Sequence, residues 1–503
     1  MRTQEFIAQT SGASLLIVEK NSVYTVSLDT KAEWAIGRYD PNRQIIPDIP
    51  LASYLVSRSH GWLKNPGDQW YFEDNGDNTN GTFINGRKLP RGENGRNTSV
   101  ALCNGDILRI DNSDLNYPDV DGVLLLFTTM PIRGQFVPFP LRERNRCTIG
   151  REKDNDICEN LAYFSARHAE IRREDGRYIL SDCNSRAGTF LNGKMISSPT
   201  VLREKDIISI CDKKYIFVED QLLRQTEPAS AYKNNASVPL SQRQVIVKAD
   251  IDYKRVKDKS GSGMKELIRN IRLEIREGTL VALLGTAGAG KSTIMNCLNG
   301  MDLKGVHGSV VYRGVDLITN FEQMKTMIGS VPQDKTFHED FTPEQEFRIA
   351  AIKRLPGDTT EKEIEERVDN VIRLLGISGV RKSKIKTLSG GEKTRVNIGI
   401  ELVSDRDMFC MDEPDQGLDP KYKHEVFQIL QRLAHEEGKS VISIIHDVSD
   451  IDMFDQVIML VKYENVGRLA FFGTPEEMRE KFNVSDLRQV YQLLETTPEK
   501  YVI

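Results

Sequence analysis

The chain has 503 residues, of which 39% are hydrophobic and 28% charged, with a formal net charge of −5. This length predicts several domains that each bury a core, and the small net charge gives no electrostatic argument for a nucleic-acid partner. The seven cysteines form no Cys-x-x-Cys pair, which favours free thiols in a reducing compartment. No apolar run approaches the roughly 18 residues that cross a bilayer, and the N-terminus lacks a signal-peptide core, so we expect a cytoplasmic chain.

Short alternating strands separated by Gly, Asn and Asp turns fill residues 14–217 and predict β-sandwich structure. The pattern occurs twice. IGR at residues 36–38 returns at 149–151, SRSH at 57–60 returns as SARH at 165–168, and NTNGTFINGRK at 78–88 returns as NSRAGTFLNGK at 184–194. Glycine and asparagine tolerate positive φ, so the last motif predicts tight turns around a short strand. We therefore predict a duplicated all-β domain, residues 1–130 and 131–222.

These three ordered motifs resemble the forkhead-associated (FHA) domain, a β-sandwich whose members bind phosphothreonine peptides through loops at one end. The resemblance implies that Arg38 and Ser57 hold the phosphate with Arg58 beside them, and that Thr79 and Asn80 contact the phosphothreonine and adjacent peptide backbone. A phosphate carries roughly −1.5 to −2 charges and three acceptor oxygens, which suits a guanidinium and a hydroxyl. A purely scaffolding role is favoured for the other motif residues: Gly37, His60, Asn85 and Gly86.

The second copy departs from this pattern. It keeps Arg151 and Ser165, which are candidate phosphate ligands by the same resemblance. Arg186 and Ala187 replace its Thr-Asn pair, and Ala166 replaces the arginine beside the serine. The side chain of alanine cannot hydrogen-bond to a peptide backbone as the carboxamide of asparagine does. We therefore expect the first copy to be the phosphothreonine reader and the second to be degenerate. A linker without periodicity is predicted at residues 223–243.

An apolar strand, a glycine-rich loop and the start of a helix follow in TLVALLGTAGAGKSTIMNCLNG, and they predict a P-loop in an α/β domain at residues 244–480. In such a loop the backbone N–H groups cradle phosphates, Lys291 reaches the β- and γ-phosphates and Ser292 reaches Mg²⁺. The cofactors implied are ATP and Mg²⁺. The predicted cradle comprises Gly285, Thr286, Ala287, Gly288, Ala289, Gly290, Lys291, Ser292 and Thr293.

A second apolar strand ends in two carboxylates in RDMFCMDEP. In P-loop hydrolases this motif gives Asp412 as support for Mg²⁺ and Glu413 as the group that polarises the attacking water. The intervening LSGGE resembles the signature of the ATP-binding cassette (ABC) family. That resemblance implies nucleotide contacts from Tyr253 and Gln333, with Gln333 also a metal ligand, and identifies His446 as the switch histidine. Lys291, Glu413 and His446 are thus the predicted catalytic residues.

The signature residues also carry an architectural expectation. In the ABC family they complete the nucleotide site of another cassette, which implies a second cassette as partner, most simply in a homodimer. The order of domains resembles bacterial G-type exporters that carry FHA domains, although EPDQGLD at residues 413–419 departs from the EPTSGLD of that branch. The predicted signature contacts to ATP are Ser389, Gly390, Gly391 and Glu392.

The leading interpretation is the ATPase part of an exporter, at the inner face of the membrane, regulated by phosphothreonine recognition. Its transmembrane domain is then absent from this chain or on a separate polypeptide, since residues 481–503 read as a tail. Phe337, Phe341 and Phe347 are candidate contacts to that domain. A soluble scaffold that uses the cassette as an ATP-gated dimeriser is the alternative. A nucleic-acid ATPase is disfavoured because no basic run resembles a phosphate-backbone footprint.

Overall fold

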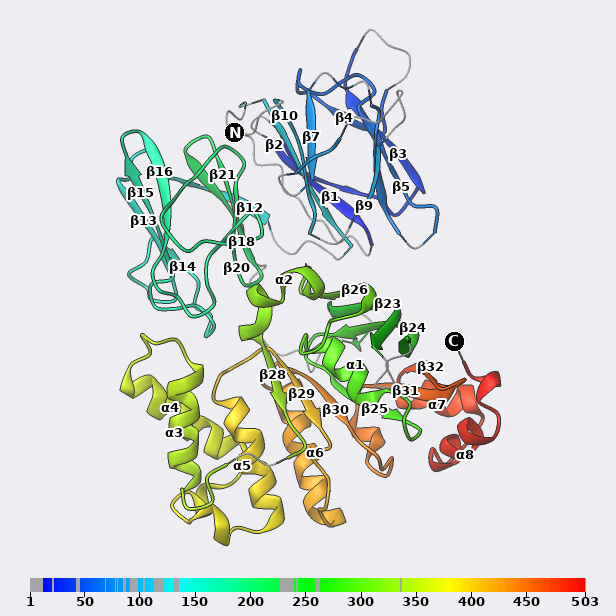
Figure 1. The fold of residues 1–503 in the computed structure, drawn as a ribbon. Coiled ribbons are helices and arrows are strands. Elements are labelled where there is room, and N and C mark those ends of the chain that lie inside the picture. The colour runs from blue at the N-terminus through cyan, green and yellow to red at the C-terminus, as the bar shows by residue number, and fades with distance from the viewer. Residues whose placement is uncertain are drawn as a thin grey trace.

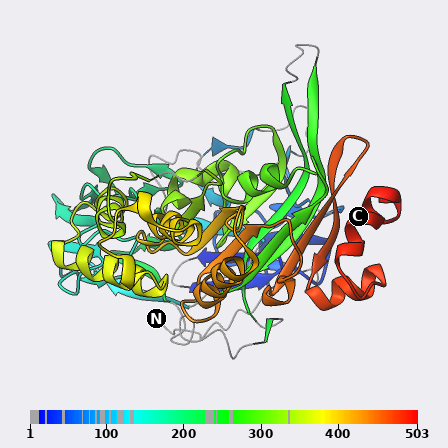
Figure 2. The ribbon, with the colours of Figure 1, turned by 90° about the horizontal axis from the view of Figure 1, so that it is seen from below.

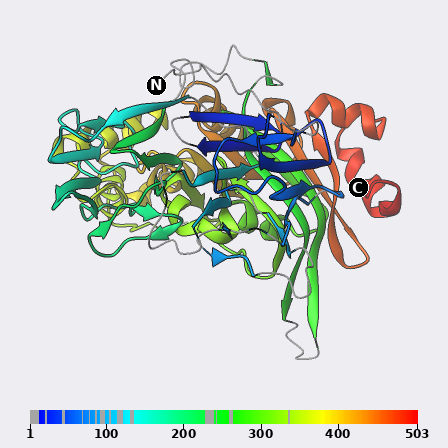
Figure 3. The ribbon, with the colours of Figure 1, turned by 90° about the horizontal axis from the view of Figure 1, so that it is seen from above.

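The computed structural model describes residues 12–19, 22–41, 46–67, 69–76, 78, 80–84, 87–90, 98–102, 105–112, 119, 121–129, 135–226, 239–240, 243–257, 263–334 and 337–502. Two β-sandwiches lie above a mixed α/β domain in Figure 1. Seen from above, the second sandwich overlies the helices of the α/β domain and the first overlies its strands (Figure 3). The predicted fold class, two all-β domains followed by an α/β P-loop domain, is confirmed.

The first sandwich consists of the six-stranded sheet β2-β1-β11-β10-β7-β8 and the five-stranded sheet β4-β3-β5-β6-β9. Alternating apolar residues such as Ile36, Leu63 and Phe72 point between the sheets and are almost completely buried. The strands are β1 (Ser14–Glu19), β2 (Ser22–Ser27), β3 (Glu33–Arg38), β4 (Ile49–Leu51), β5 (Gly61–Lys64), β6 (Tyr71–Asp74), β7 (Gly81–Ile84), β8 (Arg87–Lys88), β9 (Thr98–Ala101), β10 (Ile107–Asp111) and β11 (Val123–Thr128).

The second sandwich repeats this architecture with the sheets β12-β22-β21-β20-β17-β18 and β14-β13-β15-β16-β19. Its last strand extends four residues into the segment expected to be linker, because β22 pairs along its length with β12. The strands are β12 (Gln135–Pro140), β13 (Arg146–Gly150), β14 (Ile157–Cys158), β15 (Ala169–Glu174), β16 (Arg177–Asp182), β17 (Phe190–Leu191), β18 (Lys194–Met195), β19 (Thr200–Val201), β20 (Ile207–Ile210), β21 (Lys213–Val218) and β22 (Gln221–Thr226).

The two sandwiches pack against each other through an apolar face, so they are not independent domains joined only by a linker. Strands β1 and β11 of the first meet β20, β21 and β22 of the second. Arg109 also donates a hydrogen bond of 2.6 Å to the carbonyl oxygen of Glu204 across this contact. The buried residues of the face are Leu16, Val18, Leu124, Leu126, Ile207, Ile216, Val218 and Leu223.

The α/β domain is built on a ten-stranded sheet of order β27-β26-β23-β24-β32-β31-β25-β30-β29-β28. Strands β27, β26, β23 and β24 pair antiparallel, and β23 and β24 project well beyond the rest of the sheet (Figure 2). In the other half β25, β30, β29 and β28 run parallel. The strands are β23 (Val245–Lys257), β24 (Met264–Arg276), β25 (Leu280–Gly285), β26 (Val306–Tyr312), β27 (Val315–Asp316), β28 (Ile328–Val331), β29 (Met408–Asp412), β30 (Ser440–Ile444), β31 (Gln456–Tyr463) and β32 (Val466–Gly473).

Helices cover both faces of this sheet and bury two apolar clusters. Phe347 is fully buried in one cluster, so it packs inside the domain and is excluded as a contact to a membrane domain. The predicted tail is also folded, because α7 and α8 pack their apolar residues against the same cluster. The helices are α1 (Lys291–Leu298), α2 (Leu317–Met324), α3 (Pro343–Arg354), α4 (Glu361–Leu374), α5 (Gly390–Leu402), α6 (Pro420–His435), α7 (Pro475–Phe482) and α8 (Arg488–Thr496).

Two further sequence expectations concern thiols and membranes. The cysteines within the described ranges are free, and burial raises the pKa of Cys147, Cys211 and Cys410 to about 12, which makes these thiols poor nucleophiles. Within the same ranges, no helix combines the length and the apolar character needed to span a bilayer.

Candidate nucleotide-binding and phosphopeptide-binding sites

The P-loop joins β25 to α1 at the carboxyl edge of the parallel strands. Gly288 and Gly290 have φ of 69° and 88°, a left-handed conformation that glycine adopts without strain. No side chain caps α1, which leaves its first N–H groups directed toward the loop and available for phosphate oxygens. Lys291 donates a 3.1 Å hydrogen bond to the carbonyl oxygen of Gly285. Burial lowers the pKa of Lys291, although the carboxylates of Glu413 and Asp412 partly oppose that shift.

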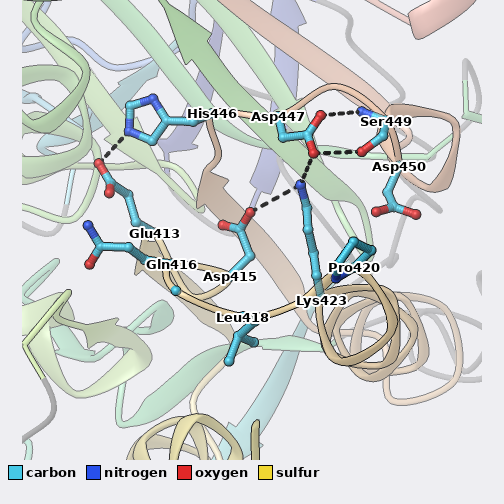
Figure 4. Close-up of a pocket in the computed structure, with 11 residues that line it drawn as sticks. Glu413, Asp415, Gln416, Leu418, Pro420, Lys423, His446, Asp447, Ser449 and Asp450 are labelled. Atoms are coloured by element: carbon cyan, nitrogen blue, oxygen red, sulfur yellow. Dashed lines mark hydrogen bonds and ion pairs between the residues drawn. The ribbon is translucent and has the colours of Figure 1, made fainter. Parts of the chain in front are cut away.

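The other predicted catalytic residues reach the same edge because β28, β29 and β30 run parallel to β25. Glu413 follows β29 with φ of 49°, a left-handed backbone conformation that is uncommon for glutamate. Its carboxylate is held from two sides: Nε2 of His446 lies 2.6 Å from Oε1, and Nε2 of Gln333 donates to Oε2 at 3.0 Å. Figure 4 shows His446 and Glu413 directed toward each other. The structure thus brings together three residues separated by as much as 113 positions in the chain, from 333 to 446.

Asp412 lies at the end of β29, next to this carboxylate. Burial, together with the negative charge of Glu413, raises the pKa of Asp412. A divalent cation at this position would relieve both effects. Ser292, Asp412 and Gln333 offer only oxygen donors to such a cation, and oxygen donors are what Mg²⁺ prefers. These residues therefore fit the predicted Mg²⁺, with the nucleotide phosphates as further ligands.

A cavity of about 610 Å³ lies beside Glu413 and His446, between the DQGLD segment and the loop after β30. Lys423 of α6 bridges it: its ammonium lies 3.4 Å from Asp415 and 2.7 Å from Asp447 (Figure 4). Burial raises the pKa of Asp415, whereas the hydrogen bond from Lys423 lowers the pKa of Asp447 to about 2. The sequence analysis missed Lys423, and the carboxylate in place of threonine at position 415 was the signal for a nearby cation.

The signature motif forms the start of α5. Ser389 is the N-cap and forms a capping box with Glu392, so both side chains are engaged with the backbone of their own helix. A Cβ atom on Gly391 would lie 3.2 Å from the ring of Tyr422, a close approach that favours glycine there. In the part of the chain that the structure describes, no hydrogen bond or ion pair joins this motif to the P-loop of the same chain, and α5 lies apart from α1 in Figure 1.

Tyr253 lies on β23, opposite His307 of β26. The two rings stack with centroids 4.9 Å apart, and the guanidinium of Arg255 lies 4.1 Å from the tyrosine ring centroid. The predicted adenine-stacking residue therefore belongs to a cationic aromatic cluster. Its role toward adenine stays a prediction.

In the first sandwich the predicted phosphate ligands lie at the end of β3 and on the loop before β5. Arg38 donates a 3.2 Å hydrogen bond to the carbonyl oxygen of Tyr54, and within the described residues it forms no ion pair with a carboxylate. Arg58 lies 3.4 Å from Asp40. Asn80 donates to the carbonyl oxygen of Leu55 at 2.9 Å, which ties its turn to the Ser57 loop. Thr79, Asn85 and Gly86 lie outside the described residues.

The same local geometry holds the serine loop in both sandwiches. The backbone N–H of Ser57 donates to Nδ1 of His60, and that of Ser165 donates to Nδ1 of His168. Both histidines are buried, and desolvation lowers the pKa of His60 to about 4, so the ring is neutral and accepts this hydrogen bond at neutral pH. At Gly37, an added Cβ would lie 2.1 Å from a backbone oxygen, so the Gly-Arg motif requires glycine.

The second sandwich uses the equivalent residues differently. Arg151 forms an ion pair with Glu363 of the α/β domain, and Ser165 accepts a hydrogen bond of 3.2 Å from the backbone N–H of Arg186. The predicted phosphate ligands of this copy are therefore engaged within the chain.

Comparison with known protein families agrees with this geometry. Residues 34–111 and 147–211 match the model of the FHA domain, and residues 268–416 match the model of the ABC transporter. The chain is thus a tandem FHA protein with an ABC-type ATPase domain. More specifically, it is similar to ABC transporter G family member 26 of Arabidopsis thaliana, 29% identical over 44% of this chain and 32% of that protein.

Among similar proteins are the ABC transporter ATP-binding/permease protein Rv1747 of Mycobacterium tuberculosis, 29% identical over 70% of this chain and 38% of that protein, and protein white of Drosophila melanogaster, 32% identical over 44% of this chain and 33% of that protein. The chain thus spans well under half the length of these relatives. A solved structure of cbiO1 from Clostridium perfringens, part of the ABC transporter complex cbiONQ, matches with a TM-score of 0.41 and 26% identity over 51% of this chain and 96% of that one.

Proposed function

We propose that this chain is the ATP-hydrolysing part of an ABC exporter and that its first FHA domain binds phosphothreonine peptides that regulate activity or assembly. The observation that carries the enzymatic part is the position of Glu413, held between His446 and Gln333 at the strand edge that also bears the P-loop. No other part of the described chain gathers a base, an orienting histidine and an anion cradle in one place.

The residues divide the work of phosphoryl transfer among themselves. The N–H groups of the P-loop and Lys291 bind and neutralise the phosphates, and bound Mg²⁺ supplies further charge neutralisation. Glu413 accepts hydrogen bonds from the attacking water and polarises it. Gln333 and His446 orient this carboxylate, since each contacts one of its two oxygens. The signature residues Ser389–Glu392 act on the nucleotide of a second cassette, which makes a homodimer the simplest assembly.

Transport is proposed from the relatives, which include the broad substrate specificity ATP-binding cassette transporter ABCG2 of the rat, 32% identical over 48% of this chain and 37% of that protein. The membrane domain would then be a partner of the cassette at the cytoplasmic face. Phe341, half-buried and stacked on His338 at 4.7 Å, and Phe337, partly buried, remain the proposed contacts to it.

Peptide recognition is proposed for the first FHA domain because Arg38 has no carboxylate partner within the described residues. A guanidinium that is held by one backbone carbonyl keeps donors for a phosphate. The bound partner is expected to be a phosphothreonine on another protein or on a neighbouring subunit.

The substitution Glu413→Gln tests the enzymatic part. The variant is expected to bind ATP, to lose most of its turnover and to accumulate as an ATP-bound dimer, because the phosphate cradle is intact while the water loses its polarising group. Mg-ATP turnover and light scattering measure the two effects. Glu480→Gln, on an exposed position of α7, serves as the matched control.

Two outcomes would contradict the proposal. Turnover of Glu413→Gln equal to that of the control would remove Glu413 from the chemistry. A variant that binds ATP but stays monomeric would contradict the proposal that two cassettes form a shared nucleotide site.

A further inference from the structure

The loops of the second FHA domain that correspond to the peptide-binding end of the first are directed at the cassette. They approach residues 355–363, the connection between α3 and α4 together with the first turn of α4, which we call the α3–α4 segment (Figure 1). Two of the three recognition positions at which the second copy departs from the first, Ala166 and Arg186, lie in this contact.

Arg151 makes the central contact. It is the counterpart of Arg38, its side chain is only 15% exposed, and its guanidinium forms an ion pair with Glu363. Its Nε also donates to the carbonyl oxygen of Phe164 at 3.3 Å, which fixes the direction of the side chain. Glu363 is itself held in place, since it forms a capping box with Thr360 at the start of α4. A carboxylate is thus paired with Arg151, whereas its counterpart Arg38 has no acidic partner among the described residues.

The remaining contacts surround this ion pair. The backbone N–H of Ala166 donates to the carboxylate of Asp358 at 2.7 Å, and Arg186 donates to the carbonyl oxygen of Leu355 at 3.2 Å. Ala187 is 3% exposed and belongs to the apolar cluster that continues into the cassette, including Met324. An asparagine at this position, as in the first copy, would bury a carboxamide among apolar side chains.

From these contacts we infer that the second FHA domain is a binding module whose ligand is the α3–α4 segment of the cassette, with the carboxylates of Glu363 and Asp358 in place of a phosphate. Carboxylates and phosphates are both anionic acceptors that a guanidinium binds, and here Nη1 of Arg151 makes the contact. Arg186, which stands where the first copy has a predicted phosphothreonine contact, binds this segment through its side chain.

This domain also contacts a second part of the cassette. Gln323 of α2 donates its side-chain N–H to the carbonyl oxygen of Cys211, and Thr326 lies 3.5 Å from the sulfur of Cys211. The second FHA domain thus bridges α2, next to the antiparallel strands, and the α3–α4 segment, which belongs to the helical part. It holds two regions of the cassette in one arrangement.

Amide hydrogen exchange in the intact chain tests this inference, with Glu363→Gln combined with Asp358→Asn. Glutamine is accepted in a capping box, so α4 keeps its start while the segment loses both charges. The Ala166 amide, which donates to Asp358, is expected to exchange about tenfold faster or more, as the loss of charge-assisted hydrogen bonds predicts. Glu366→Gln, on the same helix and paired only with Lys362 among the described residues, is the matched control and should leave Ala166 unchanged.

Amides of β15 report whether the domain stays folded. If they also exchange faster in the double variant, the test uses three other variants: Glu363→Gln alone, Arg151→Gln alone, and the two substitutions combined. A shared contact predicts that combining these two substitutions adds little to the effect of either. Unchanged Ala166 exchange in the charge-neutral variants, or an equal change with Glu366→Gln, would overturn the inference. Because turnover is not the readout, the result does not depend on the proposed ATPase activity.

Discussion

At the scale of single residues, the two FHA domains differ in the partner of one arginine side chain. Arg38 is held by a backbone carbonyl, whereas the equivalent Arg151 is paired with a carboxylate of the cassette. The residues around them in the motif, a close-packed glycine and a buried neutral histidine, are the same in both copies. These shared residues hold the same local structure in both copies, and we propose that the surroundings of the arginine decide which ligand each copy binds.

Arg38→Ala is accordingly expected to weaken binding of phosphothreonine peptides to the intact chain. A charge-assisted hydrogen bond to phosphate contributes ~1.5–3 kcal/mol, so the loss is about tenfold to a hundredfold or more. Arg151→Ala is the matched control and should leave peptide affinity unchanged, since its side chain is already engaged with Glu363. Isothermal titration with a phosphothreonine peptide library measures both. Equal losses in the two variants would mean that the second copy also reads peptides.

At the scale of elements, the catalytic edge was predictable and the bridge beside it was not. Parallel strands that each end in a polar motif must present those motifs together, so Lys291, Glu413 and His446 could be grouped from sequence order alone. Lys423 could not be assigned in this way, because its ion pair with Asp415 depends on how α6 packs after the turn. Asp415, which stands where the EPTSGLD motif of this branch has threonine, indicated an altered charge but did not identify the cation that pairs with it.

The bridge between Asp415, Lys423 and Asp447 is expected to stabilise the loop that carries His446. Lys423→Met would leave Asp415 largely buried without its cation, a cost of about 3 kcal/mol when one partner of a buried pair is removed. Lower Tm and reduced Mg-ATP turnover are the expected results, with Lys421→Met on the exposed side of the same helix as control.

A second substitution separates the ion pair from packing of the lysine stem. Adding Asp415→Asn to Lys423→Met removes the orphaned charge and should recover much of the lost stability. No recovery would mean that the contact of Lys423 with the ring of Phe427 matters more than its charge.

At the scale of the whole molecule, sequence repeats revealed two FHA domains but not their contacts. The face that joins them is made of apolar residues such as Leu124 and Ile216, whose alternation in the strands looks the same as that of residues inside a sandwich. The ion pair of Arg151 with Glu363 joins positions more than 200 residues apart, and no local sequence pattern predicts it. The sequence predicts a tail at residues 481–503, whereas α8 within that range adds Val490 and Leu494 to the apolar core of the cassette.

If the nucleotide site is shared between two chains, inactive variants should complement each other. Lys291→Ala removes the phosphate contact of one chain, and Ser389→Arg blocks the signature of the other. Each alone is expected to be inactive, but a mixture forms heterodimers with one intact site, so turnover should return to about a quarter of the parental value after random pairing. Mg-ATP hydrolysis across mixing ratios is the measurement. Absence of complementation at every ratio would argue for sites completed within one chain.

The apolar face between the two FHA domains has a mechanical consequence. Buried side chains join the first domain to the second, and the second contacts the cassette at two places. These contacts give the proposed peptide-binding loops a defined position and orientation relative to the ATPase domain, which a flexible linker would not. A captured phosphoprotein would therefore be held at one distance and one angle, with an effective concentration toward chosen neighbours that linker length does not dilute.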